Sequence, residues 1–133
     1  MDITLRVSAL GLPLGEYVVV GSGILEALAI RAAGDIDLAV TSTLHERLRA
    51  SGEWEEEVRY GKVFLKREGI DVIPSLEWEA YPTTAEEAIR TATVIDGVPF
   101  MNLDELVRFK TALGRDKDLA DIALIAAYRA SQG

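Results

Sequence analysis

The stretch VVVGSGILEALAIRAAGDIDLAV, Val18 to Val40, joins an apolar run, a glycine-serine-glycine turn and two aspartates that frame an isoleucine. The β-branched run at 17–20 predicts a short buried strand. Ser22 stands where it can cap a helix over 23–30, and the segment 35–41 returns to strand character. The stretch therefore predicts a strand, a tight turn, a helix and a second strand.

The aspartates of this stretch are unusual in a segment that otherwise reads as a buried strand. Side chains two apart on a strand point to the same face, with Cα atoms about 6.6 Å apart. We therefore expect Asp35 and Asp37 to lie together while Ile36 and Leu38 are buried on the opposite face. Two ionised carboxylates this close repel each other unless solvent, a base or a metal ion offsets their charge.

A third acid, Asp71 in the segment GIDVIP, is flanked by apolar residues on another expected strand. Three carboxylates on one surface of a sheet suit a hard cation such as Mg²⁺, which bridges carboxylates to substrate phosphates. The turn at Gly21 and Ser22 can hold those phosphates, because a glycine turn that enters a helix presents backbone N–H groups to an anion. Together these features predict a metal and phosphate site.

Each feature also has an ordinary explanation. The aspartate pair can lie on the solvent-exposed face of a half-buried strand, and the glycines can be needed only because the turn is tight. A dinucleotide-binding fingerprint is the main competitor, but it needs a third glycine where this chain has Glu26, and a single acid about twenty residues on. The aspartate pair therefore fits a metal site better than a dinucleotide site.

The rest of the chain alternates strand-like and helix-like segments that turn and cap signals separate. We expect helices at 4–10, 44–51 with Thr43 as cap, 83–92, 103–113 with Asn102 as cap, and 117 to about 130. The last of these helices is expected to bury a broad apolar stripe, formed by Leu119, Ile122, Ala123, Leu124, Ala126 and Ala127. We expect strands at 54–60, 62–67 and 70–74, with a hairpin about 96–97. These elements predict an α+β domain in which helices flank a mixed sheet and the last two helices form a pair.

Composition narrows the class of protein. The chain has 133 residues, no cysteine and a net charge of -8. This length predicts one domain, 1–133, and the absence of cysteine excludes disulfides and thiolate metal sites. An acidic chain does not favour general nucleic-acid binding, and no apolar run approaches a membrane span, so we expect a cytoplasmic protein without a membrane partner.

The combined spacing resembles the nucleotidyltransferase superfamily of the DNA polymerase β type. The residues that carry the resemblance are Gly21-Ser22, a spacer of twelve residues, the motif at 35–38 and the later Asp71. The C-terminal segment is similar to the tail of small prokaryotic members, in which a helical lysine precedes an arginine and a K-D-x-x-D-I motif. These positions hold Lys110, Arg115, Lys117, Asp118, Asp121 and Ile122.

The resemblance implies roles for individual residues. Asp35 and Asp37 would bind two Mg²⁺ ions, with Mn²⁺ as an alternative, and Asp71 would complete the site. Gly21 and Ser22 would hold the terminal phosphates of a nucleoside triphosphate.

Arg31 and Lys110 are the expected cations for that triphosphate, although both also fit as ordinary solvated side chains. The acids Asp118 and Asp121 fit first as stabilisers of a helix start.

The sequence thus predicts a metal-dependent nucleotidyltransferase that transfers a nucleoside monophosphate to a hydroxyl of an unidentified acceptor. Such small members include toxins of toxin–antitoxin pairs. At this length we expect a second copy, a partner subunit or a large acceptor to complete the site. The alternative is a module that keeps the fold, has no catalytic activity and acts with a partner protein.

Overall fold

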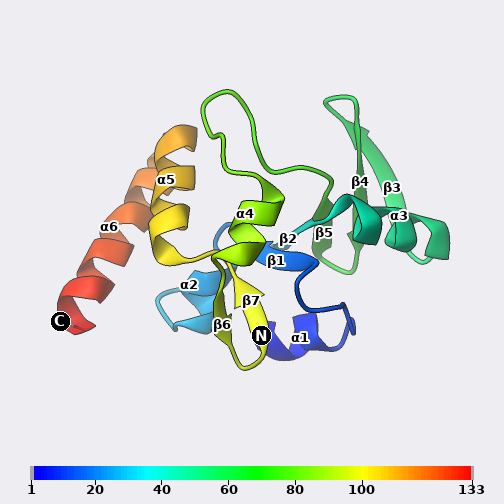
Figure 1. The fold of residues 1–133 in the computed structure, drawn as a ribbon. Coiled ribbons are helices and arrows are strands. Elements are labelled where there is room, and N and C mark those ends of the chain that lie inside the picture. Colours follow the sequence, from blue (N-terminus) through cyan, green and yellow to red (C-terminus); the bar gives the residue numbers. More distant parts are fainter. Residues whose placement is uncertain (1, 133) are drawn as a thin grey trace.

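The computed structural model describes residues 2–132, in which seven strands form one mixed sheet flanked by helices (Figure 1). The strands, in the spatial order β3-β4-β5-β2-β1-β7-β6, are β1 (Tyr17–Val20), β2 (Ile36–Val40), β3 (Glu55–Arg59), β4 (Lys62–Arg67), β5 (Ile70–Ile73), β6 (Thr93–Ile95) and β7 (Val98–Phe100). The helices are α1 (Ile3–Ser8), α2 (Gly23–Ala27), α3 (Ser42–Ser51), α4 (Ala85–Arg90), α5 (Leu103–Leu113) and α6 (Asp116–Gln132). Within residues 2–132 no helix has the length and apolar character needed to cross a membrane.

The centre of the sheet is the strand pair that the opening stretch predicts. β1 runs antiparallel to β2 and parallel to β7, and β2 runs parallel to β5. All four residues of β1 are buried, so both faces of this strand are covered. α4 packs against β1 and β2, whereas α1 and α2 pack on each other and contact β1 and β7. The mixed sheet, the flanking helices and the C-terminal helical pair confirm the predicted α+β class.

The predicted hairpin turns are confirmed by their backbone geometry. Tyr60-Gly61, Glu68-Gly69 and Asp96-Gly97 all have positive φ at both residues, as expected for the primed turns that suit twisted hairpins. β3, β4 and β5 are therefore the predicted antiparallel meander. β3 is an edge strand whose acidic side chains are mostly exposed, and charge on an edge discourages pairing with another sheet.

Among the described helices only α5 has the predicted bounds, and the structure explains the changed ends of α2 and α3. α2 has five residues instead of eight, because Ala29 adopts φ 58 and closes a Schellman motif in which the N–H of Ile30 bonds the carbonyl of Leu25 at 2.8 Å. α3 begins earlier than predicted, and its cap is Thr41 instead of Thr43. The Thr41 hydroxyl accepts a hydrogen bond from the backbone N–H of Leu44 at 3.2 Å.

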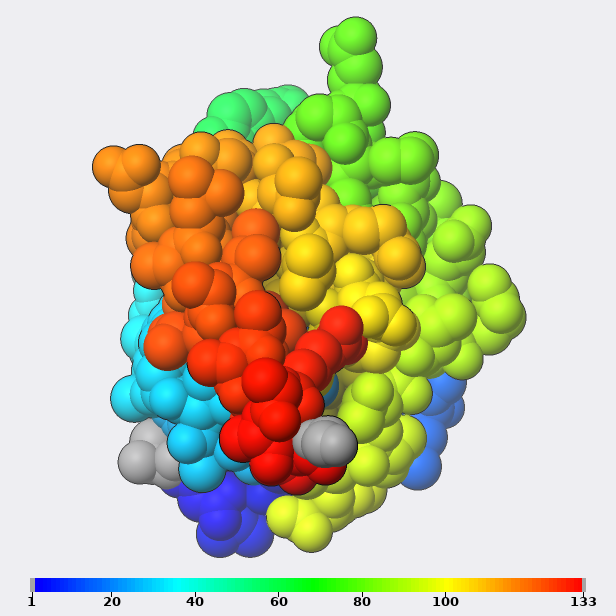
Figure 2. All heavy atoms as spheres, turned by 90° about the vertical axis from the view of Figure 1, so that its left-hand side faces the viewer, coloured from blue at the N-terminus to red at the C-terminus, as the bar shows by residue number. Residues whose placement is uncertain are grey.

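The last helix buries a different face from the one predicted. Apolar periodicity placed Leu119 and Leu124 in a buried stripe with Ile122, Ala123, Ala126 and Ala127, but Leu119 is 54% exposed and Leu124 is 40% exposed. The buried residues are Asp118, Asp121 and Ile125. Figure 2 shows α6, in orange and red, along the surface beside α5. The orientation of α6 is therefore set by ion pairs of its acidic face.

Replacing Gly23 with alanine is expected to destabilise the fold by about 1–3 kcal/mol through overpacking. A Cβ on Gly23 would lie 2.4 Å from Cγ1 of Val19 and 3.1 Å from Cδ1 of Ile3, both in the core. Urea unfolding at pH 7 measures the difference. Gly34→Ala is the matched control, because a Cβ there meets nothing within 4 Å. An equal effect of both substitutions would contradict this account of packing around α2.

Candidate functional site

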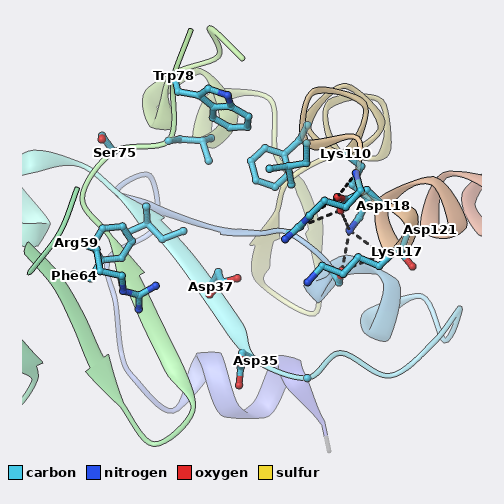
Figure 3. Close-up of a pocket in the computed structure, with 18 of the residues that line it drawn as sticks. Asp35, Asp37, Arg59, Phe64, Ser75, Trp78, Lys110, Lys117, Asp118 and Asp121 are labelled. Carbon is cyan, nitrogen blue, oxygen red and sulfur yellow. Dashed lines mark hydrogen bonds and ion pairs between the residues drawn. The ribbon is translucent and has the colours of Figure 1, made fainter. Parts of the chain in front are cut away.

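A cavity of about 560 Å³ opens where the first two strands meet the C-terminal helices. One wall is the β3–β4 hairpin with Arg59 and Phe64, and the opposite wall is formed by α5 and α6 (Figure 3). The β1–α2 turn and the beginning of β2 lie between the two walls. The cavity thus gathers the predicted site residues Gly21, Ser22, Arg31, Asp35, Asp37 and Lys110 along its lining.

The sheet brings two of the three predicted acids side by side. Asp37 of β2 pairs in register with Asp71 of the parallel strand β5, and with Val20 of β1 on its other side. Asp35 precedes β2 and is exposed at the edge of the cavity, apart from Asp37 (Figure 3). Asp71 is not part of the cavity lining. The predicted cluster is therefore an adjacent pair with a third carboxylate at the rim.

The electrostatics of Asp37 reflect this crowding. Burial, followed by the charges of Asp71 and Asp35, raises the pKa of Asp37 from 3.8 to about 6. Arg59 and Lys66 act in the opposite direction but do not cancel the effect. No residue within 2–132 donates a hydrogen bond to the Asp37 carboxylate. The fold therefore holds a carboxylate whose charge is poorly compensated.

The glycine turn lies directly beside this carboxylate. Gly21 has φ 66, a left-handed conformation that favours glycine, and a Cβ at this position would lie 3.6 Å from Oδ2 of Asp37. The side chain of Ser22, the predicted cap, makes no capping hydrogen bond to α2. Its hydroxyl instead accepts hydrogen bonds from Nη2 of Arg31 at 2.9 Å and Nζ of Lys110 at 3.1 Å. The turn therefore connects the acidic pair to a cationic cluster.

The two predicted cations are held by a buried carboxylate of α6. Arg31 makes a bidentate pair with Asp121, with Nε–Oδ1 and Nη2–Oδ2 both at 2.7 Å. Lys110 lies 2.8 Å from Oδ2 of the same residue, and the side chains of Lys110 and Asp121 are each only 6% exposed. The hydrogen bond from Arg31, with further help from Lys110, lowers the pKa of Asp121 to about 2. Ser22, Arg31, Lys110 and Asp121 form one connected network, which we call the clamp.

A second carboxylate of α6 extends the clamp. Asp118 is fully buried, accepts a hydrogen bond from Nε of Arg115 at 2.6 Å and lies 3.6 Å from Nζ of Lys110. The reading of Asp118 and Asp121 as helix-start stabilisers alone is therefore incomplete. The two aspartates are three residues apart, and this spacing places both side chains on one face of a helix. It was the sequence signal that both point toward the interior.

The hairpin wall carries two further cations, Arg59 and Lys66, that no sequence motif indicates. Nη2 of Arg59 lies 3.7 Å from Oδ2 of Asp71, and Nζ of Lys66 lies 3.9 Å from Oδ1 of Asp71. Both cations also pair with Glu57, and the Arg59 guanidinium lies 4.7 Å from the centroid of the Phe64 ring. The sequence offered no signal for Arg59, because EEEVRY is also typical of a solvated edge strand.

Aromatic side chains line the upper part of the cavity. Trp78 and Phe109 line it directly and, together with Tyr81, form a cluster with ring centroids 5.2 to 5.6 Å apart. Tyr81 is buried, and its hydroxyl donates to the carboxylate of Glu105 in α5. Thr83 donates to the same carboxylate at 3.0 Å, so the loop that carries Trp78 is tied to α5.

The donor set fits a hard divalent cation in its chemistry. Asp35, Asp37 and Asp71 offer only oxygen ligands, and their mutual repulsion is the kind that a bound cation relieves. Within residues 2–132 no group of three or more histidine, cysteine, aspartate or glutamate side chains is assembled closely enough to hold an ion as it stands. The two-ion site at these aspartates therefore stays a prediction.

Comparison with known proteins finds no relative of this chain. The chain matches no protein-family model, no curated protein and no solved structure. The resemblance to the nucleotidyltransferase superfamily therefore rests on the sequence motifs alone and stays a prediction.

Proposed function

We propose that the protein is a divalent-cation-dependent nucleotidyltransferase that transfers a nucleoside monophosphate to a hydroxyl of an acceptor. The observation that carries the proposal is the meeting of three features around the Asp37 carboxylate. The Gly21 turn borders the Asp37 carboxylate, Asp37 pairs with Asp71 on the next strand, and the Ser22 hydroxyl continues into a cationic cluster. Phosphate-holding and cation-holding groups then lie beside each other, as phosphoryl transfer requires.

In this proposal the aspartates and the glycine turn have separate roles. Asp35, Asp37 and Asp71 would hold Mg²⁺ or Mn²⁺, which supplies charge neutralisation for the attacking and leaving oxygens. The backbone N–H groups of the turn would bind the terminal phosphates through direct hydrogen bonds. The dipole of α2 would add little, because this helix has only five residues.

The reaction would join the acceptor oxygen to the α-phosphorus and break the bond between that phosphorus and the oxygen that bridges to the β-phosphate. Pyrophosphate leaves, and Asp71 is the carboxylate that we assign to accept the proton of the acceptor hydroxyl. The aromatic side of the cavity, with Trp78 and Phe109, offers apolar surface to the nucleoside or to the acceptor.

The test of this function follows a label in the α-phosphate. Each ribonucleoside triphosphate, labelled at the α-position, is incubated with Mg²⁺ and a cell extract, with wild type and with Asp35→Asn/Asp37→Asn. We expect the wild type to bind one triphosphate in a Mg²⁺-dependent manner and to label an acceptor, and the double variant to do neither. Equal binding by both proteins, or no binding by either, would rule out the assigned site.

The clamp favours a second candidate function. Because Asp121 already pairs with both Arg31 and Lys110, the cavity has fewer free cations than a triphosphate site usually offers. A module without catalytic activity that binds a nucleotide and acts with a partner protein would retain such an arrangement. Nucleotide binding without transfer of the label to any acceptor would support this alternative.

A further inference from the structure

We propose that Arg59 is a binding residue for the anionic part of the nucleotide, held by Asp71 in the free protein and released from it when a divalent cation neutralises that carboxylate. The inference rests on the proposed function and assigns a role to a residue of the hairpin wall. It predicts that Arg59 opposes cation binding and favours nucleotide binding.

The position of Arg59 supports a direct role in the cavity. It is the last residue of β3, and its guanidinium extends from the hairpin wall toward the side that carries Asp37 (Figure 3). The ring of Phe64 lies 4.7 Å from the guanidinium carbon, a distance typical of a cation–π contact. This contact supports one face of the guanidinium, while its Nε edge pairs with the exposed Glu57 and its Nη2 faces Asp71.

The contact between Arg59 and Asp71 is suited to exchange. At 3.7 Å the two groups attract each other electrostatically, but the distance exceeds that of a hydrogen bond. Both side chains are partly exposed to solvent, which weakens the attraction further. A divalent cation at the aspartates would therefore displace this pairing at small cost.

The other arginines of the cavity, and its buried lysine, are held more firmly. Arg31 and Lys110 are bound to Asp121, and Arg115 is bound to Asp118, all at 2.6 to 2.8 Å. Breaking these contacts would leave Asp118 and Asp121 buried without a partner. Arg59 also pairs with Glu57, with Nε 2.5 Å from Oε1, but the Glu57 side chain is 44% exposed, so solvent can replace this contact at small cost. Arg59 is therefore the arginine of this cavity that an incoming phosphate can recruit most readily.

Lys66 provides a matched control. Like Arg59, it pairs with Glu57 and Asp71, and both side chains are 36% exposed. Unlike Arg59, Lys66 does not line the cavity. Loss of either cation should favour a divalent ion at the aspartates, whereas only loss of Arg59 should weaken nucleotide binding.

The experiment measures two affinities in wild type, Arg59→Ala and Lys66→Ala. Binding of Mn²⁺ alone is followed by the loss of the free-ion signal in electron paramagnetic resonance, and binding of each ribonucleoside triphosphate at saturating Mn²⁺ is followed by calorimetry. We expect both variants to bind Mn²⁺ about two- to fivefold more tightly. We expect Arg59→Ala to bind triphosphate about ten- to hundredfold more weakly, and Lys66→Ala to bind it as the wild type does.

The outcomes separate this inference from the proposed function. A wild type that binds neither Mn²⁺ nor any triphosphate would overturn both. A wild type that binds both ligands, with equal triphosphate affinity in the two variants or unchanged Mn²⁺ affinity in Arg59→Ala, would overturn the role of Arg59 alone. Circular dichroism checks folding, and Arg59→Gln replaces the alanine variant if that variant does not fold. Arg59→Lys, which keeps the charge, should restore part of the triphosphate affinity.

Discussion

Asp37→Asn is expected to make the protein more stable at pH 7.5 in the absence of divalent ions, by about 1–3 kcal/mol. The fold raises the pKa of Asp37 from 3.8 to about 6, so the folded protein disfavours the charged form that the unfolded chain accepts freely. The wild type therefore loses stability as pH rises from about 4 to above 6. The neutral asparagine has no such penalty.

Urea unfolding of both proteins at pH 4 and pH 7.5 measures this effect. The difference in unfolding free energy between variant and wild type should be small at pH 4, which is close to the unfolded-state pKa of 3.8 and well below the folded-state pKa, and should be largest at pH 7.5. Mn²⁺ should stabilise the wild type and leave the variant unchanged if the aspartates bind the ion. A wild type that is the more stable protein at pH 7.5 without ions would contradict the electrostatic account of Asp37.

Asp121→Ala is expected to lower the free energy of unfolding by about 3 kcal/mol at pH 7, or the melting temperature by roughly 10 °C. The substitution leaves the Lys110 ammonium, whose side chain is 6% exposed, with the Ser22 hydroxyl and with the more distant carboxylate of Asp118 at 3.6 Å. It also removes the two hydrogen bonds between Arg31 and Asp121. Thermal unfolding followed by circular dichroism gives the difference.

Asp104→Ala is the control for Asp121→Ala. Asp104 of α5 pairs with Arg129 of α6 at 2.8 Å, but both side chains are exposed, and such pairs contribute little. We expect a change within about 0.5 kcal/mol. Equal effects of the two substitutions would show that the clamp is no stronger than a surface ion pair.

The pH dependence gives a second check on the clamp. Because the pKa of Asp121 is lowered to about 2 in the fold, its stabilising contribution is complete above the usual aspartate pKa of 3.8 and is lost as pH falls toward 2. The wild type should therefore lose more stability between pH 5 and pH 2.5 than Asp121→Asn does. A parallel loss in both proteins would contradict the assigned ion pairs.

Local signals in the sequence predicted most of the secondary structure. The β-branched run at 17–20 became β1 with identical bounds, and the glycine-containing hairpin turns fell where positive φ was needed. Gly52 and Gly114 end α3 and α5 in the left-handed conformation that glycine favours. These features follow from residues that are neighbours in the chain, so the sequence alone contains the information.

The errors arose where contacts between distant residues decide the outcome. Apolar periodicity predicted the wrong buried face for α6, because Asp121 lies inward and pairs with Arg31 and Lys110, whereas Leu119 and Leu124 are exposed. The early end of α2 was missed, since only the left-handed conformation of Ala29 reveals it. Arg59 had no local signal at all.

The sequence by itself determined the strands, the hairpin turns and the existence of each helix, and it identified the three aspartates and the glycine turn as one candidate metal and phosphate site. Only the tertiary structure decided that Asp37 and Asp71 are in register and that Asp35 lies at the rim of the cavity. It also decided that Asp121 pairs with the cations Arg31 and Lys110. The physical reason is that strand register, burial and charge compensation depend on groups that lie up to ninety residues apart in the sequence. Such groups become neighbours only when the sheet and the C-terminal helices assemble.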